Sequence, residues 1–204
     1  MTLISQIQRW WQDRSDESFY HQLSDEQLLV HYQTQCTQAA LSILIQRHSD
    51  ALYHFLLTLS DAHLAEDICQ ATWLKLVERP DRFQTNQAQF RTWLFTTGRH
   101  ALIDELRRLN RWQWASLDEL TEQDNEDWNE HLTFATHPDI QAKFDDALVQ
   151  MPFAQREALM LQLDGFSLAD IAVITQEKQE TIKSRLRFAR HFLKKTLEVT
   201  YESE

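Results

Sequence analysis

Two periodic segments near the C-terminal end, residues 168–174 and 179–195, most constrain what this chain can fold into. In the second segment, four apolar residues recur at helical spacing and mark one buried stripe: Ile182, Leu186, Ala189 and Leu193. Six cations surround that stripe: Lys183, Arg185, Arg187, Arg190, Lys194 and Lys195. A short polar stretch joins the two segments, which predicts a helix-turn-helix with the basic helix in the recognition position. Considered alone, the basic helix is equally well interpreted as a surface helix covered with solvated charge.

The scarcity of glycine and proline decides the fold class. The 204 residues include only 2 Gly and 3 Pro, against 43% apolar residues. This composition predicts a nearly all-helical chain with few tight turns. Few stretches rich in Val, Ile or Thr alternate in polarity, so strands are not expected. The length suits one or two domains, and we expect an all-α fold.

The charge is unevenly distributed along the chain. The formal net charge of −11, taken as an average, argues against a nucleic-acid binder. Residues 116–142, however, contain eight Asp and Glu and no Lys or Arg, whereas residues 178–195 contain seven Lys and Arg against one Glu. The acidic segment also loses helical periodicity, so a linker is predicted at 115–140. It would follow an unassigned arm (1–22) and a first domain (23–114), and precede a second domain (141–198).

Periodicity and end signals predict the helices of both domains. Ser24 and Gln27 form a capping box that opens the first helix. Further helices are expected over residues 37–59, 62–78 and 89–109, and from 153 onward. The last of these follows Pro152, which favours a helix start. Residues 164–166 form a helix stop, and Ser167 caps the next helix.

The helix predicted at 62–78 offers a candidate protein-docking face. Its inward residues are Leu64, Ile68, Thr72 and Leu76. Five others fall largely on the remaining faces: Glu66, Asp67, Gln70, Trp73 and Lys75. A large aromatic side chain beside exposed polar groups suggests a docking surface. The alternative is that Trp73 is one more core residue.

The helix predicted at 89–109 combines apolar surface with cations and aromatic residues. The residues that supply cations and aromatic rings, which continue past the end of the helix, are Arg91, Arg99, His100, Arg107, Arg108, Arg111 and Trp112. Single-stranded nucleic acid needs cations along its backbone and aromatic faces against its bases. As a set, these residues favour DNA binding. The alternative is that the aromatic residues are core and the arginines only solubilise the helix.

Several classes of protein are excluded or disfavoured. Cys36 and Cys69 form neither a metal-ligand spacing nor a disulfide framework. His48 and His54 are expected to pack or to lie on the surface, because no Cys or carboxylate cluster joins them. No nucleophile with a base and no phosphate-binding Gly loop is present, so an enzyme with its own cofactor is not expected. The chain lacks a long apolar run and a signal-peptide pattern, which favours the cytoplasm.

Three groups of motifs, in this order, resemble a known family. Residues 65–70 (Ala-Glu-Asp-Ile-Cys-Gln) resemble the core-polymerase-binding helix of sigma-70-type RNA polymerase sigma factors of the extracytoplasmic-function (ECF) class. Residues 90–95 and 104–108 resemble the promoter-melting helix of that family. The helix-turn-helix that reads the −35 element is similar to residues 151–152, 156–158, 181–186 and 189–190. The resemblance covers about residues 24–112 and 144–197.

The resemblance implies two helical domains, a sigma-2 bundle and a sigma-4 helix-turn-helix, and it implies site residues. The clamp helices of the polymerase largest subunit would contact Asp67, Gln70 and Trp73. The −10 DNA would lie near Arg99, His100, Arg107, Arg108, Asn110, Arg111 and Trp112. The −35 DNA would be contacted by Thr181, Lys183, Ser184, Arg185, Arg187 and Arg190.

The same resemblance implies a promoter-specificity subunit with no catalytic chemistry. Its partners would be core RNA polymerase, through the clamp helices and the flap, together with promoter DNA and an anti-sigma factor. The free chain would be a monomer that does not insert into membranes. Two rival interpretations are a stand-alone helix-turn-helix regulator that dimerises through its N-terminal helices, and a sigma-like protein-interaction adaptor.

Several positions depart from the family pattern. Gly98 lies within a predicted helix, which a glycine weakens by roughly 1 kcal/mol relative to alanine. His100 replaces a common Asn, and Ala71 replaces a common acidic residue. In the helix-turn-helix, a usual Gly, a usual apolar residue and a second usual Gly are replaced by Gln176, Glu177 and Glu180. Glu180 suits a helix N-terminus but would repel phosphate if it faced DNA.

Overall fold

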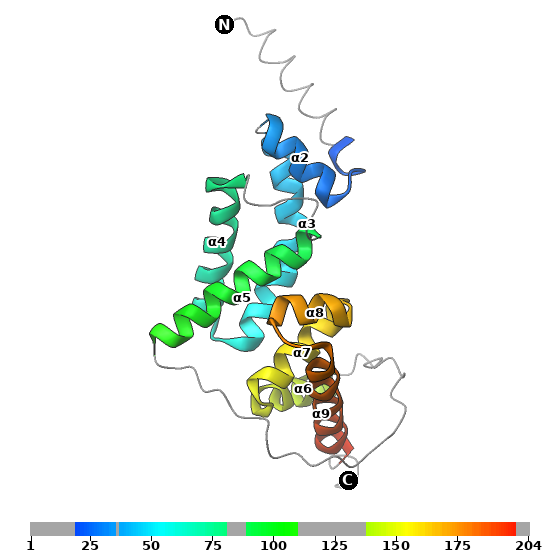
Figure 1. The fold of residues 1–204 in the computed structure, drawn as a ribbon. Helices are drawn as coiled ribbons and strands as arrows, with labels where there is room; N and C mark the ends of the chain where they lie inside the picture. Colours follow the sequence, from blue (N-terminus) through cyan, green and yellow to red (C-terminus); the bar gives the residue numbers. More distant parts are fainter. Residues whose placement is uncertain (1–18, 36, 81–88, 110–137, 199–204) are drawn as a thin grey trace, which may run out of the picture. The chain divides into compact units, whose positions relative to one another are not determined.

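The computed structural model describes residues 19–35, 37–80, 89–109 and 138–198. Within these ranges the chain forms eight α-helices and no strand (Figure 1). The all-α prediction is therefore confirmed for the described part of the chain. None of the described helices is both long enough and apolar enough to cross a membrane.

The chain divides into two compact units. The first reaches Leu102 but leaves out a short segment at 57–61, and the second contains the four C-terminal helices. The helices before the acidic segment are α2 (Asp25–Gln35), α3 (Gln38–Leu59), α4 (Ala62–Glu78) and α5 (Phe90–Arg108). Those after it are α6 (Pro138–Gln150), α7 (Phe153–Leu163), α8 (Leu168–Thr175) and α9 (Gln179–Glu198).

Aromatic contacts hold α3, α4 and α5 together. The rings of Phe55 on α3 and Phe95 on α5 have centroids 5.4 Å apart. The Phe90 ring at the start of α5 lies 6.3 Å from Trp73 on α4 and 5.7 Å from His48 on α3. All five side chains are buried, so each helix covers an apolar face of another.

The predicted start of α2 is confirmed in detail. The Ser24 amide donates to Gln27 Oε1 over 2.9 Å, and the Gln27 amide donates to Ser24 Oγ over 3.3 Å. These two bonds form the capping box expected from the sequence. Leu28, Leu29 and Tyr32 are buried as predicted.

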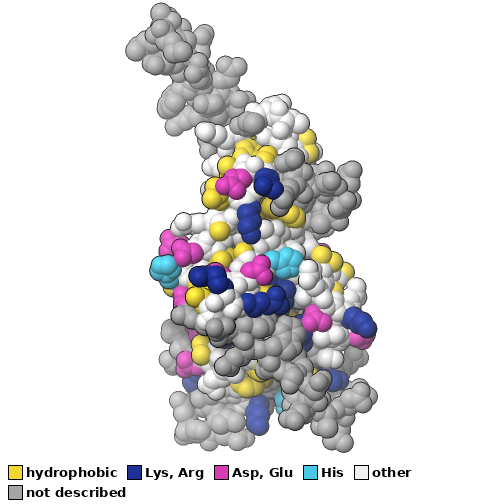
Figure 2. Space-filling view, turned by 60° about the vertical axis from the view of Figure 1, so that its left-hand side comes forward, with side chains coloured by type: hydrophobic (Ala, Val, Ile, Leu, Met, Phe, Trp, Pro, Cys, Tyr) yellow, Lys and Arg dark blue, Asp and Glu magenta, His cyan; other side chains and the backbone are white. Residues whose placement is uncertain are grey.

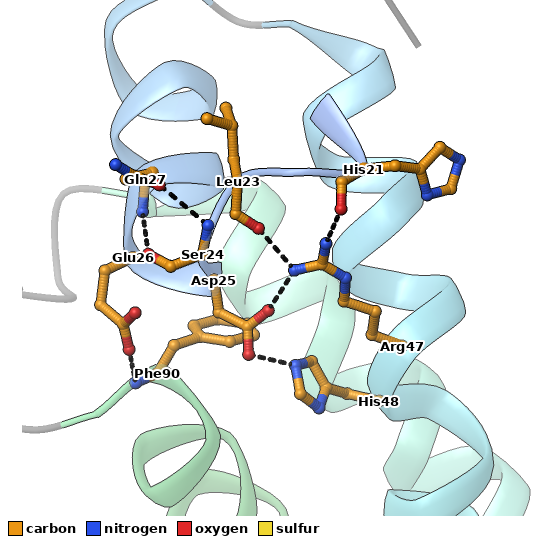
Figure 3. Close-up of polar contacts among 9 residues, drawn as sticks. All are labelled: His21, Leu23, Ser24, Asp25, Glu26, Gln27, Arg47, His48 and Phe90. Atoms are coloured by element: carbon orange, nitrogen blue, oxygen red, sulfur yellow. Dashed lines mark hydrogen bonds and ion pairs between the residues drawn. The ribbon is translucent and has the colours of Figure 1, made fainter. Parts of the chain in front are cut away.

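A polar cluster that the sequence did not reveal joins α2 to α3 (Figure 3). Asp25 Oδ2 lies 2.6 Å from His48 Nε2, and Asp25 Oδ1 accepts a hydrogen bond from Arg47 Nη1 over 2.9 Å. The Arg47 guanidinium also donates to the carbonyl oxygens of Leu23 and His21. His48 does pack in the core, as expected, but a carboxylate accompanies it. The pairing spans 23 residues of sequence, so local patterns cannot show it.

A close helix contact accounts for Gly98 in the middle of α5. A Cβ atom at this position would lie 3.0 Å from Leu52 Cδ1 and 3.4 Å from Thr72 Oγ1. Leu52 belongs to α3 and Thr72 to α4. The glycine therefore weakens the helix locally but lets three helices approach each other.

In the second unit, α9 packs against α6, α7 and α8. The predicted stripe of α9 is buried: Ile182, Leu186, Ala189 and Leu193. The helix after Pro152 is confirmed as α7. One bound differs, because α6 begins at Pro138 and not near residue 141. Proline is well tolerated in a first helical turn, because its missing N–H has no partner within the helix there.

Two turns with the same hydrogen bonds end α7 and α8. After α7, the amides of Phe166 and Gly165 donate to the carbonyl oxygens of Leu161 and Gln162. After α8, the amides of Glu177 and Gln176 donate in the same way to Ala172 and Val173. Both patterns are Schellman motifs, which require a left-handed residue. Gly165 has φ 83° and Gln176 has φ 59°, so the glutamine adopts a conformation that favours glycine.

Ser167 then starts α8 as predicted. Its hydroxyl accepts a hydrogen bond from the Asp170 amide, and the Asp170 side chain accepts one from the Ser167 amide. The helix stop at 164–166 and this cap place α8 and α9 as the helix-turn-helix expected from the sequence.

Candidate nucleic-acid interface

The outer side of α9 carries most of the residues predicted to meet −35 DNA. Lys183 is exposed, and Thr181, Ser184 and Arg187 are half-buried. The Arg187 guanidinium lies over the Phe188 ring, 5.4 Å from its centroid. Further along the helix, His191, Lys194 and Lys195 are also exposed. The helix thus buries an apolar stripe on its domain and presents polar and cationic groups on the opposite side.

Arg185 does not belong to this outer surface. Its side chain is only 3% exposed, and Nη2 donates to Glu177 Oε1 over 2.8 Å. In this structure the Arg185 guanidinium is therefore turned inward, and its role at −35 DNA stays a prediction. The spacing contained a signal, because Arg185 lies three residues after Ile182 and four before Ala189, on the buried stripe. Glu177, which replaces a usual apolar residue, is the partner of this buried cation.

Arg190 ties α9 to α7. Its Nη2 donates to Gln162 Oε1 over 2.6 Å, and burial lowers the pKa of its guanidinium. Arg156 plays a similar part at the end of α6, where its Nη1 donates to the Leu148 carbonyl oxygen over 3.0 Å. Burial also lowers the pKa of Arg156. Arg156 lies on α7, and its cation interacts favourably with the negative end of the α6 dipole. This contact joins α7 to α6. The DNA role of Arg190 stays a prediction.

On α5, the residues predicted to lie near −10 DNA separate into buried and exposed groups. Arg99 is buried, with 4% of the residue exposed, and its predicted place near −10 DNA stays a prediction. It lies four residues after Phe95 and three before Leu102, on the buried stripe of α5. His100 is half-buried, whereas Arg107 and Arg108 are exposed. The remaining predicted residues, Asn110, Arg111 and Trp112, lie outside the described part of the chain.

The exposed end of α5 carries alternating charges. Arg108 Nε donates to Glu105 Oε2 over 2.8 Å, and this hydrogen bond lowers the pKa of Glu105. Arg107 Nη1 lies 4.0 Å from Asp104 Oδ1. Both pairs are i,i+3 neighbours with exposed cations, so either arginine can exchange its carboxylate for a phosphate at little cost.

The predicted docking face of α4 is present without its aromatic residue. Glu66, Asp67 and Gln70 are exposed; Gln70 donates to Glu66 over 3.2 Å, and His63 Nδ1 lies 3.1 Å from Asp67 Oδ2. Trp73 is 8% exposed because it packs beside Phe90, so the core interpretation of this residue holds. Figure 2, which views the molecule from the α4 side, shows hydrophobic, acidic and basic side chains interspersed on this face.

The apolar part of this face was not predicted from the sequence. Leu74 and Val77 on α4 are 55% and 44% exposed. Exposed aliphatic residues beside polar ones are typical of protein-binding surfaces. Their signal was that neither residue falls on the inward stripe of Ile68, Thr72 and Leu76.

The described residues contain no group of three or more His, Cys, Asp or Glu side chains able to hold a metal ion. Cys69 is buried in α4, and this burial raises the pKa of its thiol. A raised pKa keeps the thiol protonated and unreactive near neutral pH. Cys36 lies outside the described part of the chain.

Comparison with known families matches both halves of the chain. Residues 44–112 match the family Sigma-70 region 2, and residues 141–193 match Sigma-70, region 4. The first match contains α4 and α5, and the second contains α8 and most of α9. The expected order of the two regions is therefore confirmed.

Similar proteins and structures agree with these matches. The ECF RNA polymerase sigma factor SigL of Mycobacterium tuberculosis is 30% identical over 78% of this chain and 90% of its own length. The ECF sigma factor EcfG of Rhodopseudomonas palustris is 33% identical over 73% of this chain and 80% of its own. A solved structure of the sigma factor RpoE with the anti-sigma factor NepR, from Bartonella quintana, superposes with a TM-score of 0.58 at 28% identity. It covers 78% of this chain and 96% of RpoE.

Neither family match nor relative supports the stand-alone regulator or the adaptor. The paired regions, the helix-turn-helix that carries the second, and the extended similarity to SigL and EcfG lead to one conclusion. This chain belongs to the sigma-70 family, among the ECF sigma factors that act as promoter-specificity subunits of RNA polymerase.

Proposed function

We propose that three surfaces of this chain divide the work of promoter recognition. The exposed face of α4 binds core polymerase, the end of α5 and the residues after it contact −10 DNA, and the outer side of α9 reads the −35 element. The observation that carries this proposal is the arrangement of α9, whose apolar stripe is buried while Lys183, Lys194 and Lys195 are exposed. A recognition helix needs this division between a docked side and a free side.

The contact with polymerase rests on the α4 face. Asp67 and Gln70 supply polar groups, and Leu74 and Val77 add exposed apolar area. Trp73 supports this face from beneath, since its ring packs against Phe90. Polymerase supplies the catalytic chemistry, and this chain supplies none. The complex acts in the cytoplasm.

The contact with the −10 region rests on the exposed cations Arg107 and Arg108 and on the half-buried His100. Arg111 and Trp112 continue the same cationic and aromatic composition in the sequence. Opening a duplex costs a few kcal/mol per unstacked base, and stacking of the displaced bases offsets part of that cost.

Two sequence domains carry these surfaces, at about residues 23–114 and 141–198, with the acidic linker at 115–140 between them. The family matches at 44–112 and 141–193 lie within these ranges and support the order of the two domains, and α6 extends the second domain back to Pro138. The RpoE of Bartonella quintana is bound by an anti-sigma factor, and we infer a corresponding partner for this chain. Without such a partner the chain is a monomer.

Run-off transcription with purified core polymerase and a promoter library tests the proposal. We expect initiation from a subset of sequences with defined −10 and −35 elements. Replacing Asp67 and Gln70 by Ala should weaken core binding, whereas replacing Lys183 by Ala should spare core binding and weaken −35 recognition. Stable binding to core without initiation from any sequence would instead favour the adaptor. Dimers that bind DNA without polymerase would favour the stand-alone regulator.

A further inference from the structure

The first turn of α9 presents an exposed carboxylate on the same helix as the exposed cations. Glu180 is the second residue of α9, and its side chain is 81% exposed. Lys183 Nζ lies 2.8 Å from Glu180 Oε1, and its side chain is 54% exposed. The neighbouring Arg185 is turned inward and bound to Glu177. The most exposed charged groups of this turn are therefore one acceptor and one donor, already paired with each other.

This pair matches the hydrogen-bonding edge of a particular base pair. A carboxylate only accepts hydrogen bonds, and an ammonium group only donates them. In the major groove, cytosine presents its N4 amino donor next to the O6 and N7 acceptors of its guanine partner. Adenine also has an amino donor, but its N7 acceptor on the same edge would face a carboxylate unfavourably. An adjacent carboxylate and ammonium group are thus complementary to a G·C pair.

The local charges make a carboxylate tolerable close to DNA. Phosphate would repel Glu180 if it stood alone, but the Lys183 ammonium is in direct contact with it. Lys178, which is also exposed, precedes α9 directly. The positive end of the α9 dipole adds a further favourable interaction with the carboxylate. Glu180 can therefore approach a base edge without a net local negative charge.

We propose that Glu180 and Lys183 together read one G·C base pair of the −35 element. Glu180 accepts a hydrogen bond from cytosine N4, and Lys183 donates to guanine O6 or N7. This inference rests on the proposed function of α9 in −35 recognition and adds a base preference to it.

The test replaces Glu180 by Gln in the full chain. Holoenzyme is reconstituted with core polymerase, and run-off initiation is measured over a library in which each −35 base pair is varied singly. With the unsubstituted chain, we expect one position at which G·C is preferred by about tenfold or more. Glutamine pairs with adenine N6 and N7, so Glu180→Gln should shift that one preference to A·T and leave the other positions unchanged. Lys183→Ala should weaken the preference for G·C at the same position.

Lys195→Gln provides the matched control, because Lys195 is an exposed cation of the same helix roughly 22 Å from Glu180 along the helix axis. It should leave the preference at the G·C position intact. The inference is overturned if Glu180→Gln lowers initiation equally across the library, or if no −35 position prefers G·C in the unsubstituted protein. Failure of the unsubstituted holoenzyme to initiate from any library member would overturn the proposed function itself. That result differs from a uniform loss caused by Glu180→Gln and from the absence of a G·C preference. Thermal unfolding of each variant separates these results from misfolding.

Discussion

At the scale of the single residue, the two ion pairs at the start of α9 have similar chemistry but very different surroundings. Glu180 and Lys183 are mostly exposed, whereas the side chain of Arg185 is 3% exposed and that of Glu177 is 27% exposed. An exposed pair contributes little to stability. A buried cation deprived of its partner is costly, because it has lost hydration without gaining a counter-charge.

We therefore expect Glu177→Ala to lower the free energy of unfolding of the C-terminal domain by about 3 kcal/mol. Chemical denaturation of the full chain, followed by a signal from that domain, measures the change. Glu180→Ala serves as the matched control, since it removes the carboxylate of the exposed pair on the same helix. Its expected effect is below about 1 kcal/mol. Equal effects of the two substitutions would contradict the assignment of Arg185 as a buried, paired cation.

Asp25 yields a prediction about pH. Burial disfavours its charged form, but the hydrogen bonds from His48 and Arg47 outweigh burial, and the pKa of Asp25 is lowered. A carboxyl whose pKa is lower in the folded state stabilises that state above its unfolded pKa, and this contribution is lost as the pH falls through the folded pKa.

Asp25→Asn should consequently destabilise the N-terminal domain at neutral pH, and this effect should shrink progressively as the pH falls below about 4 and through the lowered pKa of Asp25. Urea denaturation of both proteins across this pH range measures the difference. A difference in unfolding free energy that stays constant from neutral pH into acid would show that the Asp25 carboxylate is not linked to folding.

At the scale of the element, the turns after α7 and α8 use the same hydrogen bonds with different residues in the left-handed position. Gly165 has no Cβ, so its φ of 83° is unstrained. Gln176 with φ 59° carries a side chain in a region that costs about 1–2 kcal/mol for residues other than glycine. The turn between α8 and α9 is therefore less stable with Gln176 than it would be with a glycine in the same left-handed position.

Gln176→Gly should raise the free energy of unfolding by about 0.5–1 kcal/mol, because relief of strain exceeds the added entropy of the unfolded glycine. The reciprocal change, Gly165→Ala, should lower it by about 1 kcal/mol. Thermal denaturation of both variants gives the comparison. Destabilisation by Gln176→Gly would mean that the glutamine side chain makes contacts that offset its backbone strain.

A second prediction for the helices concerns Gly98, where α5 crosses α3 and α4. Gly98→Val would drive branched carbon atoms into Leu52 and Thr72, whose nearest atoms lie 3.0 and 3.4 Å from the position that a Cβ atom would occupy. We expect the N-terminal domain to lose about 1–3 kcal/mol. The unfolding midpoint in urea measures this loss. An unchanged midpoint would indicate that the helices separate freely at this point.

At the scale of the whole molecule, the distribution of charge governs when the protein binds DNA. The net charge is −11, although the residues around α9 are basic. DNA affinity depends strongly on the number of phosphates that cations neutralise and on salt. An acidic chain that exposes a few cations on one helix gains little binding free energy from neutralising phosphates. The phosphates also repel its net negative charge.

We expect the isolated chain to bind a −35 duplex weakly at physiological salt, and specific binding to appear only in the complex with core polymerase. Gel-shift measurements with and without core polymerase, repeated at several salt concentrations, test this expectation. Tight, promoter-specific binding by the isolated chain at physiological salt would contradict it.

Much of the architecture was predictable because it depends on interactions between near neighbours in sequence. The capping boxes at Ser24 and Ser167, the helix stop at Gly165 and the buried stripe of α9 follow from local hydrogen bonds and from the helical period. The bounds of the helices agree closely with the prediction for the same reason. The exception is α6, whose start at Pro138 lies inside a segment interpreted as linker from its acidic composition.

Sequence alone therefore determined the helices, their order and the family, since periodicity, caps and motif spacing are properties of the linear chain. Tertiary structure decided which charged and aromatic residues are available for binding. The spacing places Arg185 and Arg99 on apolar stripes, but a long arginine can still extend to solvent, and only packing shows that both are buried. Trp73 likewise faces Phe90 instead of a partner. The partners Glu177 and Asp25 become visible only once separate elements are brought together. The physical reason is that burial and ion pairing depend on contacts between residues that sequence patterns do not connect.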